Sequence, residues 1–246
     1  MPEQLWFTVL LNKVFGGPVN AFLQTLPPAF HPTDPQAPIT NAFAMEVFVV
    51  GILIMVFVLI RSRLSAEKPG GLQHLAEVLH EFIGNQETEI IGGHHRRFTP
   101  ILSALFLFIL ISNLIGLIPS FESPTATPAV PLGCAVVVFV YYNYHGVRAQ
   151  GPLGYLKHFL GPMWWLSPVM FPIEIIGNVA RLMSLTVRLY ANMFAGDMVT
   201  LVFFSLIPIG LPVVFLGLHT LVSFLQAYIF TLLTTIYLAG AVAHEH

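Results

Sequence analysis

The chain has 246 residues, of which 56% are hydrophobic and only 9% are charged. A soluble globular domain carries about 25% charged residues, so the composition excludes an ordinary soluble domain and indicates a membrane protein. The formal net charge of −2 excludes a strongly basic nucleic-acid-binding surface.

The N-terminal part predicts one external segment and one membrane-crossing helix. Residues 1–41 are interpreted as a mature N-terminal segment outside the membrane, because no positive region precedes their short apolar stretch. Residues 42–60 form the first predicted transmembrane helix, and Val47–Ile60 carries no charge. A bilayer crossing needs about 20 mostly apolar residues.

Residues 70–92 predict an amphipathic helix on the membrane surface. Apolar side chains recur along one face at helical spacing, while acidic side chains face elsewhere. The apolar residues are Leu72, Leu75, Leu79, Phe82 and Ile83, and the acidic residues are Glu77, Glu81 and Glu87. Two further crossings are predicted at 98–118 and 129–147, the second with tyrosines near one end as an interfacial belt.

The last third predicts two helices that are too long to cross the membrane upright. Residues 164–206 and 211–241 would measure about 65 Å and about 46 Å at about 1.5 Å per residue. The hydrocarbon core is only about 30 Å thick, so both helices must tilt steeply, as a pair. Pro208, Gly210 and Pro212 predict the turn between them. The expected fold class is an all-α, polytopic membrane protein with five membrane-crossing helices, a surface helix and a steeply tilted C-terminal hairpin.

Basic residues set the expected orientation. They gather after the first crossing, before the second and after the third, and we expect all three clusters on the cytoplasmic side. The clusters are Arg61, Arg63 and Lys68, then Arg96 and Arg97, then Arg148 and Lys157. The N-terminus is then outside and the C-terminus is cytoplasmic. A prokaryotic plasma membrane is preferred because nothing resembles a transit peptide.

The first long helix carries a polar stripe, which marks it as an ion path, because charges inside membrane helices usually do so. Its members fall within one sector of the helix. They are Glu174, Asn178, Arg181, Ser184, Arg188 and Asn192. A matching face of the second long helix holds His219, Ser223, Gln226, Thr234 and Tyr237.

The order of these groups favours proton transfer. Asp197 and His219 are expected near the outer end, Glu174 towards the inner end, and Arg188 between them. Histidine and carboxylates exchange protons near neutral pH. A guanidinium keeps its proton, yet it lowers the pKa of an acid that approaches it. Two half-channels separated by such a cation would not leak into each other.

Three segments resemble subunit a, the stator ion-channel subunit of F-type ATP synthases. They are Ser184-Leu-Thr-Val-Arg188-Leu-Tyr-Ala-Asn192-Met-Phe-Ala-Gly196-Asp197, the run from His219 through Gln226 to Tyr237, and Asn113-Leu-Ile-Gly-Leu-Ile-Pro119. The resemblance covers about residues 98–241.

The resemblance implies roles for single positions. Arg188 matches the essential arginine that faces the rotating ring of c subunits, and Asn192 and Gln226 match its polar companions. Asp197 and His219 match the acid–histidine pair of the outer half-channel, and Glu174 an acid of the inner one. The implied partners are the c-ring, peripheral-stalk b subunits and membrane lipid.

Other functions are weighed against this interpretation. The runner-up is a secondary ion-coupled transporter with a charged site at mid-membrane, although the halves show no paired repeats. A histidine-rich membrane oxidase fails for lack of repeated histidine clusters. The run His94-His95-Arg96-Arg97 lacks the further ligands that a zinc site needs, so no metal or cofactor is expected. No phosphate-binding glycine loop occurs, and the chain is expected to carry out no nucleotide chemistry itself.

Overall fold

The computed structural model describes residues 5–25, 27, 37–65, 70–92, 97–118, 121–160, 167–206 and 210–242, and this part of the chain is helical, with no strand. In chain order its elements are α1 (Trp6–Leu23), α2 (Asn41–Ser62), α3 (Gly71–Ile91), α4 (Thr99–Ile115), the short η2 (Pro124–Ala126), α5 (Ala129–Leu160), α6 (Ser167–Leu206) and α7 (Leu211–Val242). Four of them, including both long C-terminal helices, are long and apolar enough to cross a membrane. The protein is an all-α, polytopic membrane protein.

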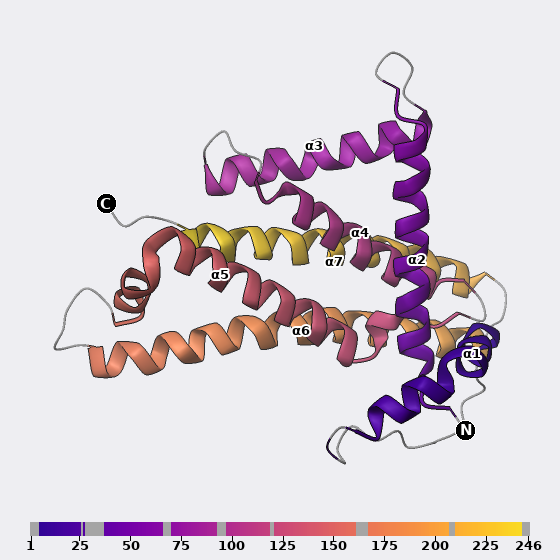
Figure 1. The fold of residues 1–246 in the computed structure, drawn as a ribbon. Coiled ribbons are helices and arrows are strands. Elements are labelled where there is room, and N and C mark those ends of the chain that lie inside the picture. Colours follow the sequence, from indigo (N-terminus) through magenta and orange to yellow (C-terminus); the bar gives the residue numbers. More distant parts are fainter. Residues whose placement is uncertain are drawn as a thin grey trace.

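Helix α2 stands across the remaining helices, with α3 at one end and α1 at the other (Figure 1). Its start is fixed by Thr40, whose side chain accepts a hydrogen bond from the Phe43 N–H at 3.3 Å. Helix α1 lies within the segment expected only to be external. It docks through Asn12, whose amide exchanges two 3.0 Å hydrogen bonds with the backbone of Ile39.

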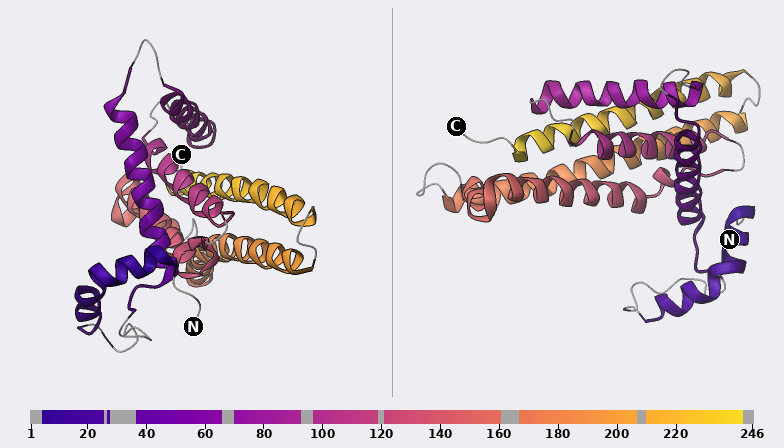
Figure 2. Two further views of the ribbon diagram at one scale, coloured as in Figure 1. Left: turned by 90° about the vertical axis from the view of Figure 1, so that its right-hand side faces the viewer. Right: turned by 45° about the horizontal axis from the view of Figure 1, so that its top comes forward.

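Helices α6 and α7 form a long antiparallel hairpin that lies across α2 rather than alongside it (Figures 1 and 2). They contain 40 and 32 residues, or about 60 Å and about 48 Å at about 1.5 Å per residue. At their joined ends the Phe203 and Phe215 rings stack at 4.2 Å. Gly210 takes φ +90° in the turn, a conformation that favours glycine. Pro208, also expected in the turn, lies outside the described residues.

Helices α4 and α5 pack on the hairpin and build the main core. Its largest buried members include Phe106 of α4, Leu189 of α6 and Phe230 of α7. Helix α4 has 17 residues and ends at Ile115, before the expected limit of 118, because the chain turns there towards η2. At about 25 Å it is shorter than the other spans.

Helix α5 continues past residue 147, where the third predicted crossing ends, and changes direction at Gly151. Gly151 takes φ +75° and ψ 161°, so the stretch up to Gly151 and the stretch after it are two helical pieces. Only a residue without Cβ adopts this backbone without strain.

Helix α3 turns its partly polar side towards the protein. Ile83 and Glu87 are buried, whereas Leu72 and Leu75 of the expected apolar face are exposed. The Glu87 carboxylate accepts hydrogen bonds from the Phe98 N–H at 2.9 Å and the Thr99 hydroxyl at 2.5 Å. It thereby joins the end of α3 to the start of α4.

Candidate proton-translocation site

Arg188 lies at mid-length on α6 and is partly exposed. Its Nη2 donates a hydrogen bond to Ser184 Oγ, one turn earlier, at 3.3 Å. Ion pairs in the described part of the chain join Arg181 with Glu174 and His219 with Asp197, and none of them includes Arg188. The guanidinium is therefore held by a neutral hydroxyl and remains available to an acid from outside the described residues.

Asn192 and Gln226 meet across the hairpin one turn beyond Arg188. The Asn192 Nδ2 donates to the Gln226 Oε1 at 2.7 Å, which fixes the register of α6 against α7 at this level. Gln226 is 2% exposed, and its Nε2 has no hydrogen-bond partner among the described residues. A buried amide donor left in this state costs free energy, so the position is suited to water or a partner group.

Asp197 and His219 also meet across the hairpin, nearer its joined end. Asp197 Oδ1 lies 3.8 Å from His219 Nδ1, close enough for an ion pair but too far for a direct hydrogen bond. The Nε2 of His219 is buried without a partner among the described residues. Two groups that can exchange protons thus lie side by side, and one ring nitrogen of His219 has no partner among the described residues.

Gly196 makes room for the histidine. A Cβ at this position would lie 2.9 Å from His219 Cε1 and 3.0 Å from His219 Nε2. The ring of His219 therefore packs directly on the backbone of α6. This contact explains why the residue before Asp197 is glycine.

Hydrogen bonds hold the loop after α4 beside the part of α7 that carries His219. Asn113 is fully buried, donates from Nδ2 to the Ser223 carbonyl at 3.3 Å, and accepts from the Thr125 hydroxyl at 2.6 Å. Ser123 bonds both Thr125 and the Ser112 carbonyl. Since Ser223 lies one turn from both His219 and Gln226, this network supports the polar face of α7.

Glu174, Asn178 and Arg181 form a second polar group towards the start of α6. Arg181 Nη2 lies 4.0 Å from Glu174 Oε1, and the Asn178 Nδ2 donates to the Glu174 carbonyl at 3.2 Å. Tyr142 of α5 donates its hydroxyl to Asn178 Oδ1 at 2.7 Å, and the ring of Tyr237 lies 5.5 Å from Arg181 Cζ. The tyrosine at 142 was expected only as part of an interfacial belt.

The predicted residues therefore form two separate groups. Asp197 and His219 are near the joined end of the hairpin, and Glu174, Asn178, Arg181 and Tyr237 are near its open end. Arg188, Asn192 and Gln226 lie between the two along the chain. Within the described residues no three histidine, cysteine or acidic side chains gather as a metal site, and His94, His95 and Arg96 are not among those residues.

Comparison with known proteins decides the family. The family model described as "ATP synthase A chain" matches residues 43–239. The chain belongs to the ATP synthase A chain family. Its relatives include the ATP synthase subunit a of Koribacter versatilis, 56% identical over 100% of both chains. That of Solibacter usitatus is 52% identical over 86% of this chain and 91% of the relative. Subunit a 1 of Syntrophotalea carbinolica is 43% identical over 85% and 86%.

Membership in the ATP synthase A chain family gives the general function. The chain is a proton-channel stator subunit of the membrane FO sector and a multi-pass membrane protein. The family favours this function over a secondary transporter. Its place in FO implies other membrane subunits as partners.

Proposed function

We propose that the chain provides two offset half-channels that load and unload protons on the carboxylates of a rotating c-ring, with Arg188 at the boundary. Protons enter by Asp197 and His219, ride round on the ring, and leave past Glu174. This cycle couples the transmembrane proton gradient to ATP synthesis, while the nucleotide chemistry takes place elsewhere in the complex.

The unpaired state of Arg188 is the observation that carries the proposal. Its described contact is a 3.3 Å hydrogen bond to a serine hydroxyl, and no described carboxylate lies within ion-pair distance. A charged group in a membrane helix is costly unless it pairs. A carboxylate arriving on the ring would supply that pair and would lose its proton, because the guanidinium favours the ionised acid.

The polar groups on either side of Arg188 support the half-channels. The Asp197–His219 pair and the Glu174–Asn178–Tyr142 group occupy different ends of the hairpin, and each contains groups able to exchange or relay a proton. The bond between Asn192 and Gln226 keeps the two long helices in register beside Arg188.

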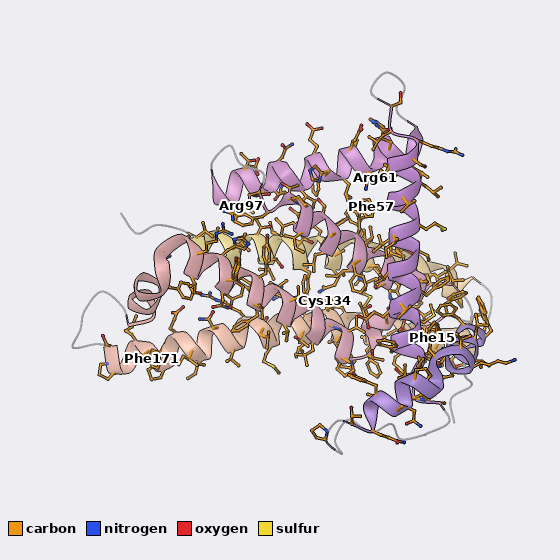
Figure 3. All side chains as sticks on the ribbon, in the orientation of Figure 1. Phe15, Phe57, Arg61, Arg97, Cys134 and Phe171 are labelled. Carbon is orange, nitrogen blue, oxygen red and sulfur yellow. The ribbon has the colours of Figure 1, made fainter. Side chains whose placement is uncertain are left out.

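The proposed orientation puts the N-terminus outside and the C-terminus in the cytoplasm. Arg61 and Arg97 lie on the side of the molecule that carries α3, and Phe15 of α1 lies on the opposite side (Figure 3). The positive-inside rule then assigns the α3 side to the cytoplasm. We further propose that peripheral-stalk b subunits and lipid cover the exposed apolar surface of the remaining helices.

Replacing Arg188 by Ala tests the proposal. The assembled complex should lose ATP synthesis driven by a proton gradient, because nothing would then deprotonate the ring acid or separate the half-channels. Arg181→Ala is a matched control that removes another arginine of α6. Because Arg181 already pairs with Glu174, the complex with this variant should retain part of the coupled ATP synthesis. Coupled ATP synthesis at the parent rate in the Arg188→Ala complex would contradict the proposal.

A further inference from the structure

The reversal of α5 at Gly151 folds the chain back onto its own helix. Beyond Gly151, the Tyr155 hydroxyl donates a hydrogen bond to Asn143 Oδ1 at 2.8 Å, across twelve residues of sequence. The Asn143 Nδ2 in turn donates to the Phe139 carbonyl at 2.7 Å. Asn143 is thus held at both ends of its side chain, once by Tyr155 and once by its own helix.

Gly146 provides the place for the Tyr155 ring. A Cβ at Gly146 would lie 2.5 Å from Tyr155 Cε2 and 3.2 Å from the Ala241 carbonyl of α7. Gln150 donates to the same carbonyl at 3.2 Å. The ring, α5 and the end of α7 are therefore packed in contact at this point.

The Tyr155 side chain adjoins the group around Glu174. Asn143, which it binds, is next in sequence to Tyr142, whose hydroxyl binds Asn178. Burial, and to a lesser degree the neighbouring Tyr142, raises the pKa of Tyr155 to about 12. The phenol therefore keeps its proton at physiological pH and acts only as a hydrogen-bond donor and acceptor.

We propose that Tyr155 is a positioning residue of the inner half-channel, which holds Asn143 and thereby aligns Tyr142 of α5 with Asn178 and Glu174 of α6. The inference rests on the proposed function, because it assigns a role within one of the two half-channels. Tyr155 itself does not ionise during the cycle. Its hydroxyl fixes the α5 wall along which protons pass Glu174.

Tyr155→Phe tests this role, because it removes the hydroxyl and keeps the ring on Gly146. Passive proton conduction is measured in vesicles that carry the FO complex without its catalytic part, with the pH of each face set independently. The rate should fall by about twofold to tenfold, the loss expected from one hydrogen bond. Its dependence on the pH of the inner face should change, and its dependence on the pH of the outer face should not.

The second variant is Asn143→Ala, which removes the acceptor and leaves Tyr155 in place. It should give the same one-sided change, although it also removes the bond from Asn143 to the Phe139 carbonyl. The loss in the double variant should be smaller than the product of the two single losses, because both changes remove the hydrogen bond between Tyr155 and Asn143. Tyr144→Phe is the matched control and should conduct as the parent does, because Tyr144 is exposed and contacts His145 through its ring.

Three outcomes would overturn the role of Tyr155. They are an unchanged rate in Tyr155→Phe, a rate loss with the same pH dependence on both faces, or losses that multiply in the double variant. Coupled ATP synthesis in the Arg188→Ala complex tests the proposed function independently of the role of Tyr155. If Arg188→Ala abolishes coupled synthesis while Tyr155→Phe conducts protons normally, only the proposed role of Tyr155 is contradicted.

Discussion

Single residues at the hairpin carry unused hydrogen-bonding capacity in the described structure. Arg188 has no carboxylate partner there, and His219 and Gln226 each bury a nitrogen atom without a partner. Buried polar groups are normally satisfied, so unsatisfied ones point to a ligand, water or another subunit. His219 and Gln226 contact Asp197 and Asn192 across the hairpin, and this placement supports the proposed path for protons.

Gly196→Ala tests the packing of the Asp197–His219 pair. The added Cβ would lie 2.9 Å from the His219 ring, which must move away from α6 and from Asp197. Overpacking of this kind costs about 1–3 kcal/mol. Proton pumping by the assembled complex should fall severalfold. Gly217→Ala, where a Cβ meets nothing within 4 Å, should pump normally, and equal rates in both variants would contradict the role of this contact.

The contacts of the candidate site residues were only partly predictable from the sequence. The spacing of Glu174, Arg181 and Arg188 on one helix could be read directly, because a helix has a fixed angular period. The partners of such polar residues on other helices could not be predicted in this way. Asn113 reaches the Ser223 carbonyl across 110 residues of sequence, and local periodicity contains no information about such a contact.

At the scale of elements, the joint between α3 and α4 depends on a buried acid. Glu87 is 2% exposed and satisfies two donors at the start of α4. The sequence placed Glu87 away from the apolar face of the surface helix. It could not show that this face turns inward, since acidic residues are usually exposed.

Glu87→Ala should destabilise the assembled complex. The Phe98 N–H and the Thr99 hydroxyl would lose their acceptor, and each unsatisfied buried group costs about 1–3 kcal/mol. Thermal unfolding of the purified complex should therefore begin at a lower temperature, with a smaller shift for Glu87→Gln. Glu89→Ala on the exposed side of α3 should have no effect. Equal melting of the Glu87 and Glu89 variants would show that the joint does not depend on this acid.

The two long C-terminal helices were predictable, whereas the bend in α5 was not. Residues 164–206 and 211–241 were expected to be long helices, and α6 and α7 extend over Ser167–Leu206 and Leu211–Val242. The continuation of α5 past residue 147 and its change of direction at Gly151 were not predicted, because the local pattern does not decide whether a glycine ends, bends or continues a helix. The tertiary contacts of Tyr155 with Asn143 and Gly146 supply the missing information.

At the scale of the whole molecule, the long hairpin of α6 and α7 crosses the direction of α2 (Figure 2). Helix α3 packs against α7, where the Phe82 and Tyr228 rings lie 5.8 Å apart. Many apolar side chains of α6 and α7 remain exposed, including Ile176, Leu201 and Val213. In a membrane protein such surfaces contact lipid or partner subunits. The proposed partners are the c-ring and the peripheral stalk.

Purification in mild detergent tests these partners. The chain should be recovered with c-ring and peripheral-stalk proteins, because its exposed apolar surface and its unpaired arginine are completed by them. Mass spectrometry of the purified complex identifies the companions. Recovery of the chain alone, or only as a homo-oligomer, would instead favour a transporter.

The position of Arg188 in the assembled FO complex is the central question. A structure of this chain beside its ring measures the separation between the Arg188 guanidinium and the nearest ring carboxylate. We predict that Arg188 faces the ring, with a ring carboxylate able to come within ion-pair distance as the ring turns. A guanidinium that is ion-paired to an acid of its own chain and directed away from the ring would contradict the account.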